Sequence, residues 1–218
     1  MKNSHRFQTS HAIDAYSAAR DLWDTPLFES KSFIALPTVG TLVEGWLLVV
    51  PKVPAISFAQ VSKALFSELD QFINEVVHVV ALNYGPVAVF EHGPCTKKSK
   101  VGCGVDYAHL HLVPTRCDLL AGAKQVAPNI QWNSIESLSE IQNYANDVEG
   151  YWFLQQSFGS GICHMGKCEY GEPTSQLFRR VIANYIGRPS AFDWKHSMGE
   201  DKIAATVASL SSARLLLT

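Results

Sequence analysis

Gly104-Val-Asp-Tyr-Ala-His109-Leu-His111-Leu-Val-Pro114 is the stretch that decides the fold of this chain, because two histidines stand two positions apart in an otherwise apolar run. Side chains alternate along a strand, so Tyr107, His109, His111 and Val113 are expected on one face. The two rings then stand about 6 to 7 Å apart along the strand. The spacing predicts a core face on one side and a paired-imidazole site on the other.

The whole-chain composition indicates one compact unit. The 218 residues are 47% hydrophobic and 17% charged, with a formal net charge of −2. A chain of this length buries about 70% of its surface on folding. The near-neutral charge argues against a nucleic acid polymer as partner, while a single phosphate-bearing ligand stays compatible. With no apolar run of membrane-spanning length and a polar start at 1–10, we predict a cytoplasmic protein with no membrane partner.

Five cysteines form an odd and unevenly spaced set, at positions 95, 103, 117, 163 and 168. Such a set favours free thiols in a reducing compartment over a disulfide framework. Cys163-His164-x-x-x-Cys168 offers zinc-ligand side chains, but the spacing is poor and no second Cys-x-x-Cys supports it. We predict no metal and no cofactor, with zinc binding by cysteines kept as the alternative.

Hydrophobic periodicity outlines the first half of the chain. It predicts a helix over 11–23, a strand over 32–39 and a buried strand at Gly45–Pro51, the two strands joined by a short hairpin link. Ser57 with Gln60 forms a capping-box pattern before apolar positions at steps of three and four, which predicts a long helix over about 58–83. Gly85 and the proline after it supply the stop.

The second half begins with a strand over 87–91 and a loop to Gly104, followed by the histidine strand. Further strands are expected over 150–158 and 161–168, and helices over about 175–186 and 201–210. We therefore predict an α+β fold with a central antiparallel sheet of about five strands or more, a long helix across one face and a C-terminal helical extension. Residues 1–115 form the expected core and 116–218 an α+β extension packed on it, as one compact domain.

This order of elements, ending in a strand with His-x-His, resembles the histidine triad (HIT) superfamily, whose signature is His-x-His-x-His. His109 and His111 match the second and third histidines, and Tyr107 stands at the first. Gly45-Trp-Leu-Leu-Val-Val-Pro-Lys52 is similar to the family's Gly-His-apolar-apolar-apolar-Ile-Pro-Lys element, with Trp46 in place of histidine. Stretches at 23–29, 90–93 and 175–180 look similar to longer bacterial members related to dinucleoside polyphosphate hydrolases.

The resemblance implies a HIT-like fold and a nucleotide substrate. It implies a nucleotide hydrolase or nucleotidyl transferase that attacks the α-phosphate of a nucleoside phosphoanhydride, phosphoramidate or phosphoester. His109 would be the nucleophile that forms a covalent nucleotidyl-histidine, and His111 would bond the phosphoryl or bridging oxygen and help the leaving group depart. A neutral imidazole suits this chemistry, and an intermediate divides one difficult displacement into two easier ones.

Several further residues are candidates for substrate binding. Backbone N–H groups of Gly102, Cys103 and Gly104 would stabilise developing negative charge. The remaining candidates are side chains expected near the same pocket: Trp46, Glu91, His92, Tyr107 and Gln176. We also expect the rings of Trp46 and Tyr107 to lie close together, because each replaces a family histidine.

Three alternatives stay open on the sequence alone. The enzyme could instead be a phosphorylase that passes the nucleotidyl group to phosphate. The chain could bind nucleotides without turnover, since two family histidines are replaced. A histidine pair on a strand, taken without context, is more often exposed or structurally bonded than catalytic. A homodimer is the macromolecular partner that the resemblance leaves open.

Overall fold

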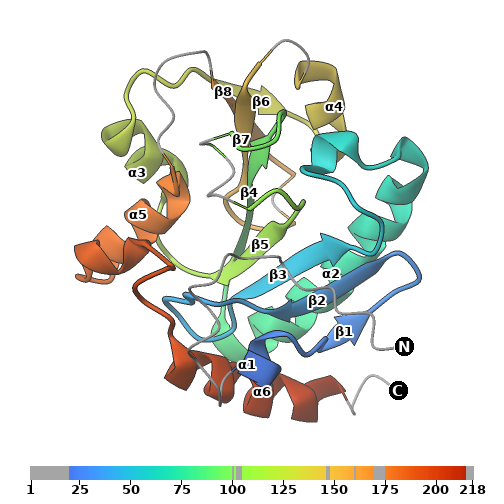
Figure 1. Cartoon of the computed structure of the whole chain (residues 1–218), viewed down its shortest axis with the longest axis vertical. Coiled ribbons are helices and arrows are strands. Elements are labelled where there is room, and N and C mark those ends of the chain that lie inside the picture. The colour runs from blue at the N-terminus through green and yellow to red at the C-terminus, as the bar shows by residue number, and fades with distance from the viewer. Residues whose placement is uncertain are drawn as a thin grey trace.

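The computed structural model describes residues 20–99, 101, 105–145, 148–159, 161–168 and 175–214 (Figure 1). Of the helix predicted over 11–23, only its end lies in these ranges, where α1 spans Arg20–Trp23. The predicted donors Gly102, Cys103 and Gly104 lie outside the described residues.

One antiparallel sheet of eight strands organises the described part of the chain, in the order β1-β2-β3-β5-β4-β7-β8-β6. This confirms the α+β class with an antiparallel sheet. The strands after residue 115 continue the same sheet through the pairing of β4 with β7. The strands are β1 (Phe28–Glu29), β2 (Phe33–Pro37), β3 (Leu47–Pro51), β4 (Val87–Pro94), β5 (Leu110–Pro114), β6 (Trp132–Ile135), β7 (Gly150–Gln155) and β8 (Cys163–Cys168).

The histidine strand β5 lies inside the sheet, between β3 and β4. His111 is in register with Leu48 on β3 and with Phe90 on β4. Leu110 and Leu112 point into the core beneath α2 (Phe66–Tyr84), while Val113 and Phe90 belong to the core beneath α5 (Leu177–Tyr185). Both faces are therefore covered, which explains why the strand reads as a continuous apolar run.

The long helix begins later than its sequence pattern predicts. It starts at Phe66, and two 3₁₀ turns at Phe58–Gln60 and Lys63–Leu65 precede it. Ser57 makes no capping bond. The N–H groups of Phe58 and Ala59 instead reach Glu91 Oε1 at 2.9 Å and Tyr151 Oη at 3.1 Å. Distant acceptors thus replace the predicted local cap, and the turn stays separate from the helix.

The polar stretch after residue 115 holds three elements that the hydrophobic pattern does not predict. They are α3 (Leu119–Val126), β6 and α4 (Ile141–Tyr144). Asp118 caps α3 by accepting from the N–H of Ala121 at 2.9 Å. β6 is the last strand of the sheet, so its polar middle residues are exposed.

The C-terminal helices occur close to the predicted positions. α5 begins at Leu177, and α6 spans Glu200–Arg214, longer than expected. Figure 1 shows α6 below the sheet edge that carries β1 and β2, with α3 and α5 side by side further up. None of the helices in the described ranges is long and apolar enough to cross a membrane.

Candidate functional site

The two histidines of the decisive stretch lie side by side, as the alternation predicts. His109 directly precedes β5 and His111 lies within it. Their ring centroids are 4.9 Å apart with the planes at 77°. Both rings are enclosed, with only 5% of His109 and 4% of His111 exposed. The pair is therefore a buried feature of the sheet face that α5 covers.

The hydrogen bond of His109 fixes which ring nitrogen carries the lone pair. Nδ1 lies 2.7 Å from the carbonyl oxygen of Tyr107. A carbonyl can only accept, so Nδ1 carries the hydrogen and donates it. Burial lowers the pKa of His109, against the opposing effect of this bond, and the ring is neutral at pH 7. In a neutral ring with hydrogen on Nδ1, the lone pair is on Nε2.

His111 holds the opposite tautomer. The indole N–H of Trp46 donates to its Nδ1 at 3.1 Å, so the hydrogen of the neutral ring is on Nε2. That N–H is buried and has no hydrogen-bond partner in the structure described. The ring stacks on Phe90, with centroids 4.6 Å apart. An unpaired buried donor costs about 1 to 3 kcal/mol, so it marks a place where a ligand acceptor would be stabilising.

A third imidazole completes the group that we call the imidazole cluster: His92, His109 and His111. His92 is fully buried on β4, and its ring centroid is 5.8 Å from that of His111. Its Nε2 accepts from the backbone N–H of Phe178 at 3.2 Å. The structure therefore places His92 beside the predicted pair and ties it to the first turn of α5.

Burial and neighbouring positive groups keep the cluster neutral. Burial is the main cause that holds the pKa of His92 and His111 well below the ordinary value, and each is lowered further by His109 and Arg179. The guanidinium of Arg179 lies 5.1 Å from the centre of the Trp46 ring and donates to the carbonyls of Phe192 and Gly40. The guanidinium therefore keeps its positive charge beside the cluster, because both of its acceptors are neutral carbonyl oxygens.

The neutral cluster predicts a specific loss of stability in acid. Below about pH 6.5 the unfolded chain binds protons at its histidines and the native cluster does not, so the free energy of unfolding falls as the pH falls. His92→Gln keeps an acceptor for the N–H of Phe178 and removes one titrating group. Between pH 7 and pH 5, urea unfolding should show a smaller loss of unfolding free energy for this variant than for the wild type. Equal losses would contradict the neutral state assigned to His92.

Glu91 does not lie with the imidazoles. It neighbours His92 on β4, and adjacent strand residues point to opposite faces. Its carboxyl group accepts from the N–H of Phe58 and from the hydroxyl of Tyr151, under α2. Burial raises its pKa to about 8, so the group is mostly a neutral acid at pH 7. We therefore leave Glu91 out of the substrate-binding set.

Trp46 and Tyr107 are not neighbours, so that expectation is wrong. The indole of Trp46 reaches His111 from the position before β3, while the hydroxyl of Tyr107 donates to the carbonyl of Pro51 at 2.8 Å, at the end of β3. The Trp46 ring contacts Phe90 and His111, whereas Tyr107 packs on a separate cluster of β2 and β3 side chains. The two aromatics thus make different contacts: Trp46 holds an imidazole, and Tyr107 holds a strand end.

Gln176 lies at the start of α5 in a left-handed conformation, with φ 59°. Only 7% of it is exposed, and its amide makes long bonds of 3.5 and 3.4 Å to Asp193 and the N–H of Trp194. It stands two residues before Phe178, whose ring is 4.8 Å from Phe90 and 5.3 Å from His92. The structure thus places Gln176 in the segment that covers the cluster.

Sequence reasoning missed two residues around the cluster: Phe90 and Phe178. Phe90 follows from alternation, because it precedes His92 by two positions on a strand and so shares its face. Phe178 comes from a helix more than 60 residues after His111. Helical periodicity marks the buried side of α5 but says nothing about which strand it packs against.

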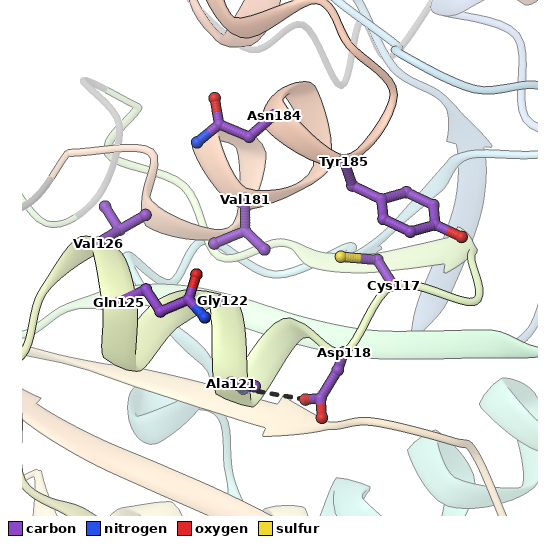
Figure 2. A pocket seen from close by; sticks show the side chains of 9 residues that line it. All are labelled: Cys117, Asp118, Ala121, Gly122, Gln125, Val126, Val181, Asn184 and Tyr185. Atoms are coloured by element: carbon purple, nitrogen blue, oxygen red, sulfur yellow. Dashed lines mark hydrogen bonds between the residues drawn. The ribbon is translucent and has the colours of Figure 1, made fainter.

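A separate pocket of about 400 Å³ lies between α3 and α5 (Figure 2). None of the residues that line it belongs to the imidazole cluster. Its walls include Val181 and Tyr185 from α5, and Cys117 from the segment before α3. Asp118 is already engaged there as the cap of α3. The polar side chains that line it are Asp118, Gln125, Asn184 and Tyr185.

The cysteines do not gather into a metal site in the described ranges. No group of three or more His, Cys, Asp or Glu side chains is placed there to hold an ion. Cys95, Cys117 and Cys163 are free thiols, and Cys103 lies outside the described residues. Burial raises the pKa of Cys95, Cys163 and Cys168 to about 11, so these three stay protonated.

Comparison with known proteins finds partial structural likenesses. No family model and no curated protein matches the chain in sequence. A HIT-like protein involved in cell-cycle regulation from Bartonella henselae is similar over 41% of this chain and 68% of its own, at 15% identity and TM-score 0.37. A second HIT-like protein is similar over 42% and 85%, at 20% identity and TM-score 0.36. A hypothetical histidine triad nucleotide-binding protein from Sulfolobus tokodaii strain 7 is similar over 41% and 59%, at 17% identity and TM-score 0.36.

Proposed function

We propose that this protein binds a nucleotide at the imidazole cluster and transfers its nucleotidyl group through His109. One observation carries the proposal: His109 holds a lone pair on Nε2, and a ring 4.9 Å away holds a buried N–H with no acceptor. A nucleophile beside a free donor is complementary to a phosphoryl group, whose phosphorus accepts a lone pair and whose oxygens accept hydrogen bonds. The sequence resemblance to the histidine triad superfamily supports the same chemistry.

The proposed reaction has two displacements at the α-phosphorus. Nε2 of His109 forms a bond to phosphorus while the bond to the bridging oxygen or nitrogen breaks, and the leaving group takes the electron pair. The Nε2–H of His111 donates to a phosphoryl oxygen or to the leaving atom. Water then attacks the same phosphorus and gives a proton to the solvent, while the phosphorus–nitrogen bond breaks and its electron pair returns to Nε2 of His109. In a phosphorylase, phosphate attacks in place of water. Backbone N–H groups at 102–104 are the expected further donors.

The position of the hydrogen on His109 Nδ1 supports the nucleophile role. When Nε2 bonds to phosphorus the ring becomes cationic, and the Tyr107 carbonyl at 2.7 Å stabilises the N–H dipole that strengthens. The bond also prevents rotation of the ring, so the lone pair keeps one direction. No protein base is needed to prepare this nucleophile, because burial already keeps the ring neutral.

A nucleotide-binding protein without turnover is the second candidate function. The enclosure of the cluster favours it, since His109 and His111 are 5% and 4% exposed and Phe178 packs on Phe90 and His92. A substrate would have to displace covering side chains before its phosphorus reached Nε2. Binding with slow or no chemistry is the outcome expected if that displacement does not bring phosphorus into line.

Intact-protein mass spectrometry separates the two candidates. The protein is incubated with adenosine and guanosine 5′-phosphoramidates and with dinucleoside polyphosphates, then denatured at alkaline pH, where a phosphorus–nitrogen bond to histidine survives. We expect a mass increase of one nucleoside monophosphoryl group, lost on acid treatment and mapped to His109. Saturable binding of these nucleotides without any adduct or product would favour the non-catalytic function.

Product analysis separates a hydrolase from a phosphorylase. Each turned-over nucleotide is incubated with and without inorganic phosphate, and the products are resolved by chromatography. A hydrolase yields the nucleoside monophosphate in both cases. A phosphorylase yields the nucleoside diphosphate and needs phosphate for turnover, because phosphate then takes the place of water in the second displacement.

A further inference from the structure

We propose that Glu91 and Tyr151 are positioning residues for His109, acting from the opposite face of the sheet. The inference rests on the proposed function, because it assigns these side chains to the alignment of the proposed nucleophile. Neither touches the imidazole cluster in the described structure. Their effect travels through the turn at Phe58–Gln60 and the segment that precedes it.

The first part of the connection is a buried polar contact under α2. Glu91 on β4 and Tyr151 on β7 are 1% and 0% exposed. The hydroxyl of Tyr151 donates to Glu91 Oε2. The N–H of Phe58 donates to Glu91 Oε1 at 2.9 Å, and the N–H of Ala59 donates to Tyr151 Oη at 3.1 Å. Two consecutive backbone N–H groups of the turn are thus held by these two side chains.

The second part joins the same segment to His109. The N–H of Ala108 donates to the carbonyl of Ala55 at 2.7 Å, three residues before Phe58. The Tyr107 hydroxyl donates to the Pro51 carbonyl at 2.8 Å, and the Tyr107 carbonyl accepts from Nδ1 of His109 at 2.7 Å. The residues before His109 are therefore pinned at two points to 51–55. A shift of that segment would move the carbonyl that sets the His109 tautomer.

A neighbouring glycine makes room for the contact between Glu91 and Tyr151. Gly93 is in register with Tyr151, and a Cβ at Gly93 would lie 2.1 Å from the Tyr151 ring. Only glycine leaves room for the ring there. A buried acid is a costly way to fill a core, and an apolar pair would pack without that cost. The acid and the phenol serve the N–H groups of the 58–59 turn, which would otherwise be buried without acceptors.

Variants at both positions test the proposal. Glu91→Leu and Tyr151→Phe each remove an acceptor for the turn, whereas Glu91→Gln keeps a carbonyl oxygen that accepts from the N–H of Phe58. Glu68→Ala is the matched control, since the Glu68 carboxylate also holds a distant turn, by accepting from Ser30 and Ser32, but binds no N–H group of the 58–59 turn. All four are compared with the wild type under conditions where circular dichroism shows them folded.

The decisive measurement is the imidazole spectrum of His109 by long-range ¹H–¹⁵N NMR. The wild type, Glu91→Gln and Glu68→Ala should show one tautomer with hydrogen on Nδ1. Tyr151→Phe and Glu91→Leu should show mixed tautomers, and the rate of adduct formation should fall about 10-fold or more. Unchanged His109 signals and an unchanged adduct rate in folded Tyr151→Phe would overturn the proposal, even if Glu91→Leu failed to fold.

The two proposals fail in different ways in this experiment. If the wild type forms no adduct with any nucleotide, the proposed chemistry is wrong, and the tautomer measurement still decides the positioning role. If the wild type forms the adduct while every folded variant keeps the His109 tautomer and the wild-type rate, the positioning role is wrong and the chemistry stands. A tautomer change in Glu68→Ala equal to that in Tyr151→Phe would also overturn the positioning role, because the His109 tautomer would then respond to the loss of an acceptor elsewhere.

Discussion

His109→Ala is expected to abolish the nucleotidyl adduct and to lower turnover by about 10³-fold or more, since removal of a covalent nucleophile costs at least this much. The loss follows from geometry, because Nε2 of His109 is the ring nitrogen that carries the lone pair in the proposed pair. Single-turnover kinetics with the nucleotide that gives the strongest adduct measures the rate, and intact mass measures the adduct.

Two further variants are compared with His109→Ala. His78→Ala is the control, because it removes the same side chain from an exposed position on α2. It should turn over like the wild type. His111→Ala should slow adduct formation by about 10²-fold, the contribution of a positioned proton donor, while the adduct still maps to His109. Full adduct formation by folded His109→Ala would show that another residue is the nucleophile.

The wild type is expected to lose up to about 5 kcal/mol of stability relative to Glu91→Gln as the pH rises from about 4.5 to 8. Burial raises the pKa of Glu91 from an ordinary 4.5 to about 8 in the native protein. Between these values the native state holds a proton that the unfolded chain has lost. The free energy of unfolding therefore falls as the pH rises through this window, and glutamine does not titrate.

Urea unfolding of both proteins at half-unit pH steps measures the difference. The histidines are common to both proteins, so their contribution cancels. Glu68→Gln is the opposite control, because hydrogen bonds from Ser30 and Ser32 lower the pKa of Glu68. The stability that Glu68→Gln loses relative to the wild type should be lost at neutral pH, and this loss should shrink below about pH 4.5. A constant difference between the wild type and Glu91→Gln from pH 5 to 8 would show that Glu91 is ionised in the native protein.

Strand patterns gave the reliable part of the sequence prediction. Apolar runs and the short link between them correctly predict the hairpin of β2 with β3, and alternation correctly predicts the shared face of His109 and His111. Applied to β4, the same rule separates Glu91 from His92, a consequence that the list of binding candidates overlooked. The alternating pattern is present in β4, so the error was that this pattern was not applied to the two neighbouring candidates.

Contacts between distant segments account for the remaining differences. The capping-box pattern at Ser57 is present, but Glu91 and Tyr151 hold the N–H groups of the turn, and the helix begins at Phe66. The polar residues Asn133 and Ser134 lie in a strand because β6 pairs with β8, which comes later in the chain. In both cases the local pattern is weaker than a partner that comes from another part of the chain.

The sequence by itself determined the order of the elements apart from α3, β6 and α4, the strand that carries the histidines and the face on which they lie, because period-two and helical patterns depend only on neighbouring residues. The tertiary structure alone decided the state of the site. Trp46 sets the tautomer of His111, Tyr107 sets that of His109, and both rings are buried. Protonation and hydrogen position follow from burial and from partners far apart in the chain, and only folding brings those together.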